Sequence, residues 1–174
     1  MTTDNSFVRS ENKANAVGRP RAFDTIIYGG LVVGVLDFFD ATIFFGLRGS
    51  STISIFQFVA SGLLGPAAFS GGYKTFLLGV LLHFLNAFII ATIYYIASCG
   101  LPTLIRHPFI WGPVYGIVVH FVMTFVVTPL SAAPARKTYP IAVMLNGLIG
   151  HALLVVLPIA LLARRSAQLQ NRER

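Results

Sequence analysis

Two acidic residues stand inside a long apolar stretch near the start of the chain. The segment "GVLDFFDAT", Gly34 to Thr42, carries Asp37 and Asp40 with no lysine or arginine beside them. A charged aspartate at the centre of a bilayer costs at least about 2.5 kcal/mol, so such residues face a bundle interior and find polar partners. The two carboxylates are therefore the first candidates for a functional site.

Three histidines occur in one local pattern within later apolar stretches. In "GVLLHF", "GIVVHF" and "GLIGHA" a glycine precedes a histidine by four residues, which places both on one face of a helix. At a rise of about 1.5 Å per residue, these histidines and the two aspartates fall at compatible depths. Five ionisable side chains from four helices would meet if their faces all point inward. The pairs are Gly79 and His83, Gly116 and His120, and Gly147 and His151.

This polar set supports three hypotheses, of which we favour the first. Polar side chains can hydrogen-bond across helices and fix their register without any turnover. Alternatively, aspartates and histidines form a proton relay or a small-ion site. In the third hypothesis, histidines on different helices ligate haem or a transition metal, whose identity the sequence leaves unknown. An Asp–His pair is the natural contact, and the neutral candidate partners are Thr42, Asn86, Tyr94, Thr124 and Asn146.

The glycines predict close contacts between helices. Small residues four apart let helix backbones approach one another in lipid. Gly30 and Gly34 have this spacing one turn before Asp37, and the glycines that precede the three histidines continue the pattern. We expect these faces to be packing surfaces, and they would also permit a homo-oligomer or a place in a larger membrane complex.

Composition identifies the environment of these helices. Of 174 residues, 55% are hydrophobic and only 11% are charged, whereas a soluble domain carries roughly a quarter charged residues. Apolar stretches reach the roughly 20 residues that span a hydrocarbon core. We predict an all-α, integral membrane four-helix bundle over residues 23–163. Its spans cover residues 23–47, 73–97, 109–128 and 141–163.

The connection after the first span predicts an additional helix over residues 51–64. A Ser/Thr cluster precedes it and Gly65 follows it, as is typical of a helix start and stop. Its apolar residues fall three or four apart, but it is too short to span a bilayer. We interpret it as an interfacial helix, with a lid over an outward-facing cavity as the alternative.

Basic residues set the orientation of the chain. The two ends and the loop with Arg106 hold nine, against four on the other side, which places both termini in the cytoplasm. Residues 1–22 are predicted to be a disordered cytoplasmic tail and residues 164–174 a basic one. Because the basic residues flank apolar stretches, the net charge of +7 indicates lipid headgroups as partners rather than nucleic acid.

Signatures of enzymes are missing from the sequence. It has no H-E-x-x-H, no C-x-x-C-H, no Gly-rich phosphate loop and no serine nucleophile elbow. A single cysteine, Cys99, excludes an internal disulfide. We expect a non-enzymatic membrane protein, an accessory or envelope component, with proton, ion, metal or haem binding by the Asp/His set as the alternative.

Three runs carry a resemblance to a known group. "LLHFLNAFIIATIYYIA", "LPTLIRHPFIWGPVYGIVVHFVMTFVVTPLSAAP" and "GLIGHALLVVLPIALLARR" resemble small four-helix bacterial inner-membrane proteins of unassigned function, distantly of the YagU type. The resemblance covers the last three predicted spans. It implies four helices in a bacterial inner membrane and supplies no catalytic residues.

Overall fold

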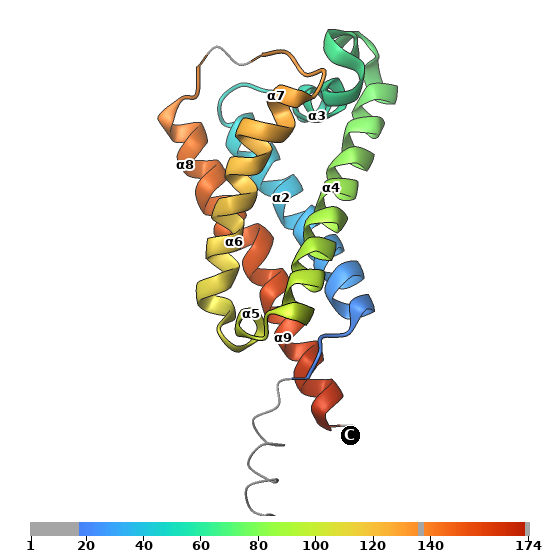
Figure 1. The fold of residues 1–174 in the computed structure, drawn as a ribbon. Helices are drawn as coiled ribbons and strands as arrows, with labels where there is room; N and C mark the ends of the chain where they lie inside the picture. Colours follow the sequence, from blue (N-terminus) through green and yellow to red (C-terminus); the bar gives the residue numbers. More distant parts are fainter. Residues whose placement is uncertain (1–17, 136–137, 173–174) are drawn as a thin grey trace, which may run out of the picture.

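The structure, a computed structural model, describes residues 18–135 and 138–172 (Figure 1). Every regular element in these ranges is helical, which confirms the predicted all-α class. Five stretches within them are long and apolar enough to cross a membrane, as is typical of a multi-pass membrane protein. They are Asp24–Gly46, Thr52–Ser70, Gly72–Gly100, Pro108–Leu130 and Ile141–Arg172.

The first two long helices pack closely because glycine leaves room for aromatic rings. A π-helical turn, η1 (Asp24–Tyr28), leads into α2 (Gly29–Gly46), which packs against α4 (Gly72–Gly100). A Cβ atom on Gly30 or Gly34 would overlap the rings of Phe88 and Phe84 from α4. Both glycines therefore mark the contact between these helices.

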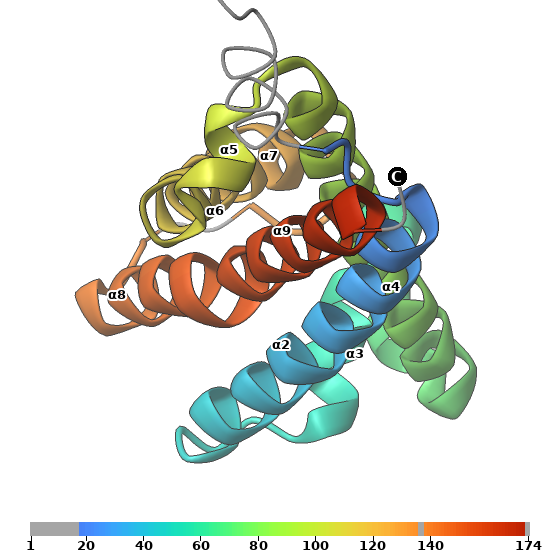
Figure 2. The same cartoon turned by 90° about the horizontal axis from the view of Figure 1, so that it is seen from below.

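Helix α3 (Thr52–Leu64) corresponds to the predicted additional helix and continues as a 3-10 turn, η2 (Gly65–Ser70). Ser51 caps its start by accepting a hydrogen bond from the backbone N–H of Ser54 at 3.1 Å. Figure 1 shows α3 almost end-on and Figure 2 along its length, so it lies across one end of the bundle.

Polar and apolar contacts hold α3 against the first turns of α4. The Gln57 side chain is buried and donates to the Gly72 carbonyl and the Thr75 hydroxyl, at 3.1 and 3.2 Å. Phe56 is 1% exposed, and its backbone lies so close to Gly79 that a Cβ there would overlap its carbonyl oxygen. The helix is thus part of the packed fold.

The second half of the chain forms two long helices with irregular turns. The short α5 (Thr103–Arg106) leads into α6 (Pro108–Val122), η3 (Met123–Val127) and α7 (Thr128–Leu130). The last stretch contains α8 (Ile141–Ile149), η4 (Gly150–Val156) and α9 (Leu157–Arg172).

Both η3 and η4 are π-helical, and each ends two residues before a proline, Pro129 or Pro158. A proline removes one helical N–H and its ring crowds the carbonyl four residues earlier. Wider π turns relieve this crowding. At η3 the Thr128 hydroxyl also donates to the Met123 carbonyl at 2.8 Å.

Most residues of the core where the long helices cross are small or β-branched. The buried cluster includes Val33, Ala91, Tyr94, Val156 and Ile159. Many large apolar side chains point outward, such as Leu77, Leu81 and Leu85 along α4, which are 50–66% exposed. Small residues inside and large apolar residues outside are typical of helices that pack in lipid.

The helix ends differ little from the predicted spans, except at the C-terminus. The predicted basic tail continues α9 as a helix as far as Arg172, and residues 173–174 lie outside the described residues. Of the predicted N-terminal tail, residues 1–17 lie outside them too. The backbone N–H of Arg21 donates to Ser166 of α9 at 3.1 Å. Both ends of the described chain lie at the same end of the bundle (Figure 1).

Candidate functional site

A cavity of about 200 Å³ brings together four of the five predicted ionisable residues. We call it the acidic cavity. It lies between α2 on one side and α6, η3, α8 and η4 on the other. Among the described residues that line it, none is a lysine or an arginine. The lining residues are Asp37, Asp40, Ala41, Phe45, His120, Thr124, Tyr139, Val143, Met144, Asn146, Gly147 and His151.

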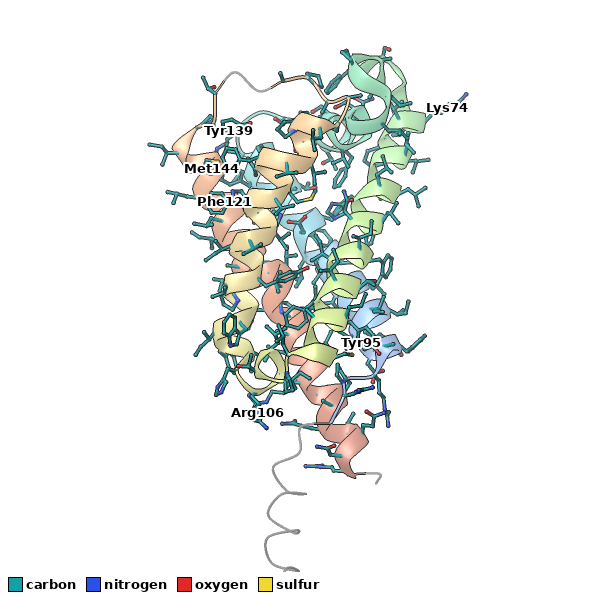
Figure 3. All side chains as sticks on the ribbon, in the orientation of Figure 1. Lys74, Tyr95, Arg106, Phe121, Tyr139 and Met144 are labelled. Atoms are coloured by element: carbon teal, nitrogen blue, oxygen red, sulfur yellow. The ribbon has the colours of Figure 1, made fainter. Side chains whose placement is uncertain are left out.

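The acidic cavity lies towards the end of the bundle opposite the chain termini. Tyr139 and Met144, which line it, are found near the connection between α7 and α8 (Figure 3). Helix α2 packs against η4 and α9, whereas α2 and α8 diverge (Figure 2). The buried cluster that contains Val119, Val155 and Val156 begins beside it. The cavity therefore occupies the space between diverging helices above a packed core.

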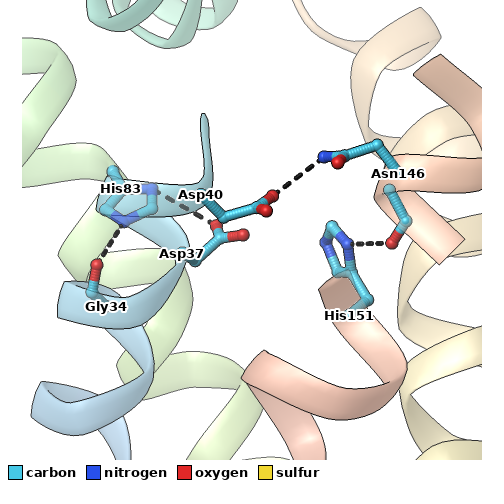
Figure 4. Close-up of polar contacts among 7 residues, drawn as sticks. Gly34, Asp37, Asp40, His83, Asn146 and His151 are labelled. Atoms are coloured by element: carbon cyan, nitrogen blue, oxygen red, sulfur yellow. Dashed lines mark hydrogen bonds and ion pairs between the residues drawn. The ribbon is translucent and has the colours of Figure 1, made fainter. Parts of the chain in front are cut away.

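Asp40 connects the two sides of the acidic cavity. Its Oδ2 accepts a hydrogen bond from the Asn146 side-chain amide of α8 at 2.9 Å (Figure 4). The same oxygen would lie 3.2 Å from a Cβ on Gly150, so glycine at the start of η4 lets the carboxylate approach. Asn146 is thus one of the neutral partners that the sequence offered.

Asp37 lies near His83, the fifth predicted ionisable residue, which is not among the residues that line the acidic cavity. The Nδ1 of His83 and Oδ2 of Asp37 are 3.8 Å apart. The Nε2 of His83 is 2.8 Å from the Gly34 carbonyl oxygen (Figure 4). A carbonyl only accepts, so Nε2 carries the proton and donates. His83 therefore joins α4 to α2.

Aromatic rings surround His83 on several sides. The rings of Phe38, Phe56 and Phe84 have centroids 6.5, 5.4 and 5.5 Å from that of the imidazole. Its side chain is only 11% exposed. His83 is thus a packed residue of the contact among α2, α3 and α4.

The other two histidines form a pair within the acidic cavity. The ring centroids of His120 and His151 are 5.3 Å apart, with the ring planes tilted by 59°. The Nδ1 of His151 donates to the Gly147 carbonyl at 2.7 Å, and its other nitrogen faces the carboxylates (Figure 4). His120 is 6% exposed, and its buried Nε2 has no hydrogen-bond partner in the described part of the chain.

Two glycines of the repeated pattern determine how closely this pair can pack. A Cβ on Gly116 would overlap the His151 carbonyl oxygen, so α6 and η4 touch backbone to backbone. A Cβ on Gly147 would overlap the His120 ring. Gly116, four residues before His120, therefore contacts His151. Gly147, four residues before His151, contacts His120.

The described residues do not provide a metal site. No group of three or more His, Cys, Asp or Glu side chains among them could hold a metal ion. His83 is directed to a backbone carbonyl, away from the pair formed by His120 and His151. His83 therefore does not belong to one ligand set with His120 and His151.

Several lining residues gave no signal in the sequence. Phe45, Tyr139 and Met144 line the acidic cavity beside the acids, but apolar and interfacial residues of these types are common in any membrane helix. The lid alternative for α3 also finds no support in the lining, because none of the α3 residues described belongs to it.

Comparisons with protein-family models, curated proteins and solved structures returned no match for this chain.

Proposed function

We propose that the chain is a non-enzymatic bacterial inner-membrane protein with four spans and both termini in the cytoplasm. Helices α2, α4, α6–α7 and α8–α9 would cross the bilayer, with α3 at the outer interface. The position of the termini at one bundle end supports an even number of spans. Arg106, Arg164 and Arg165 belong to that end, and Lys74 to the other (Figure 3).

We further propose that this bundle binds a small monovalent cation, the proton included, in the acidic cavity. The observation that carries the proposal is that Asp37 and Asp40 line one cavity in which no other described lining residue is a lysine or an arginine. Carboxylates inside a bilayer are costly unless they are paired. Among the described residues, the two aspartates have one amide hydrogen bond and one histidine at 3.8 Å. A cation would complete the charge balance.

Binding can be tested on the full chain purified in a neutral detergent. We expect sodium or methylammonium to raise the melting temperature at constant ionic strength, because a ligand that binds the folded state stabilises it. The double variant Asp37→Asn/Asp40→Asn keeps the side-chain shapes and should lose this shift. Asp24→Asn changes an acid outside the cavity lining and should keep it. Equal shifts in all three proteins would refute the proposal.

A purely structural role is the second candidate. It is favoured by the Asp40–Asn146 and His83–Gly34 hydrogen bonds, both of which join different helices. The chain would then be an accessory component whose polar residues fix helix register, alone, as a homo-oligomer or within a larger complex. In that case the aspartate variants alter stability or assembly, and no cation shifts the melting temperature of the wild type.

A further inference from the structure

A second pocket has one lining residue, Phe45, in common with the acidic cavity. This pocket, which we call the apolar pocket, has a volume of about 300 Å³. Helix α2 contributes Phe45, and the following loop, α3 and η2 contribute the rest. Its lining residues are Phe45, Ser50, Ser54, Ile55, Phe58 and Phe69.

We propose that the two spaces together bind one amphiphilic primary amine, with its ammonium group in the acidic cavity and its apolar part in the apolar pocket. This inference rests on the proposed function and names the class of cation. It also gives α3 a role, since Ser54, Ile55 and Phe58 of this helix would contact the ligand.

The size of the acidic cavity favours a polyatomic cation. A water molecule occupies roughly 30 Å³ in the liquid, so about 200 Å³ is far more than one ion needs. Phe45 and Tyr139 also line the cavity, and aromatic faces attract organic cations within about 6 Å of the ring. An organic ammonium group uses both the charge and the rings.

The acceptors in the acidic cavity favour a primary amine in particular. A primary ammonium has three N–H donors, like that of lysine. Asp37 and Asp40 offer carboxylate oxygens, and the buried Nε2 of His120, another lining residue, has no hydrogen-bond partner among the described residues. A neutral imidazole nitrogen of this kind can accept a hydrogen bond. The unpartnered nitrogen is an observation independent of the two acids.

The test compares three probes on the full-length protein in neutral detergent, by isothermal titration and thermal unfolding. Methylammonium supplies the charged group alone, phenethylammonium adds the apolar part, and phenethyl alcohol has the apolar part without the charge. We expect phenethylammonium to bind at least about tenfold more tightly than methylammonium, because it also buries a ring. Phenethyl alcohol should show no saturable binding.

Variants separate the two spaces. Phe69→Ala should reduce the affinity advantage of phenethylammonium over methylammonium to about threefold or less. The affinity for methylammonium should stay unchanged, because Phe69 lines the apolar pocket and not the acidic cavity. Phe109→Ala is the matched control, because Phe109 is 67% exposed at the start of α6. Asp37→Asn/Asp40→Asn should abolish binding of both amines.

The outcomes distinguish this inference from the proposed function. Methylammonium binding that needs the aspartates, with no advantage for phenethylammonium, would overturn the inference and leave the cation site in place. An advantage that Phe69→Ala does not reduce would also overturn it. Failure of every cation to bind would refute both.

Discussion

At the scale of single residues, the two carboxylates have different surroundings. Asp40 has a direct hydrogen bond to Asn146 and lies against Gly150. The Nδ1 of His83 lies 3.8 Å from Oδ2 of Asp37. This contact is an ion pair only when the imidazole is protonated. Asp40 therefore has the clearer structural role, whereas Asp37 has more freedom to contact a ligand.

A double-mutant cycle should measure the Asp40–Asn146 hydrogen bond. Asp40→Ala alone both breaks the bond and removes a charge from the membrane interior, and these two effects have opposite signs. The coupling energy with Asn146→Ala isolates the bond, and we expect about 1 kcal/mol in favour of the pair. Reversible unfolding in mixed micelles gives the four free energies. A coupling energy of zero would mean that the bond does not form.

His83 should matter for stability rather than for cation binding. His83→Ala removes the hydrogen bond to Gly34 and leaves a hole among three phenylalanine rings, so we expect a loss of about 3 kcal/mol. His107→Ala, in the exposed loop before α6, should change the free energy of unfolding little. Methylammonium affinity should stay within about threefold. An intact fold that no longer binds cations would instead place His83 in the site.

Four of the five ionisable residues singled out in the sequence line the acidic cavity. Ionisable groups in an apolar run are conspicuous, and helix depth alone indicates that Asp37, Asp40, His120 and His151 could meet. Asn146 is a candidate partner for the same reason. The role of His83 was not predictable, because its partner is the Gly34 carbonyl, and every residue carries such a group.

At the scale of elements, glycine and proline determine how the helices fit. Glycines permit the backbone contacts of α4 with α3 and of α6 with η4. Pro129 and Pro158 follow the π turns of η3 and η4, which contain Thr124 and His151 of the acidic cavity. Irregular helix turns thus carry part of the cavity lining, as they often do at functional sites.

Gly79→Ala should destabilise the fold strongly, although it adds only one methyl group. The new Cβ would overlap the backbone carbonyl of Phe56 in α3. Unlike a side chain, this carbonyl cannot rotate out of the way. We expect a loss of about 2–3 kcal/mol, at the upper part of the range for overpacking.

Gly46→Ala is the matched control for this change. Nothing lies within 4 Å of a Cβ at Gly46 in α2, so alanine should be neutral or stabilise by up to about 1 kcal/mol. Thermal unfolding of both variants beside the wild type provides the comparison. Equal effects of the two substitutions would mean that α3 does not pack on α4 as described.

Helix positions were more predictable than helix ends. Apolar length alone placed the long helices to within a few residues, apart from the end of α9. The continuation of α9 to Arg172 was missed, since Arg164 and Arg165 resemble the end of a span. Ser166 and Ala167 are nevertheless buried, and Ser166 accepts the backbone N–H of Arg21. That contact joins residues distant in sequence, which no local pattern reveals.

At the scale of the whole molecule, the position of α3 decides the topology. By length and composition Thr52–Ser70 qualifies as a fifth span, yet α3 lies across the bundle end in Figures 1 and 2. If α3 lies at the interface, both termini share a side of the membrane. If it crosses, they lie on opposite sides, and the apolar pocket would face the bilayer interior.

Cysteine labelling of membrane vesicles can distinguish these arrangements. In a Cys99→Ala background, single cysteines replace Leu47 before α3, Ser70 after it, and Gln168 in α9, all at exposed positions. An impermeant maleimide should label the first two only in right-side-out vesicles and the third only in inside-out vesicles, because in the proposed topology three spans separate Ser70 from the cytoplasmic end of α9. Cysteines at positions 47 and 70 labelled from opposite sides would show that α3 crosses the membrane. The proposed outward orientation of the acidic cavity would then be wrong, and with it the side from which the amine is expected to enter.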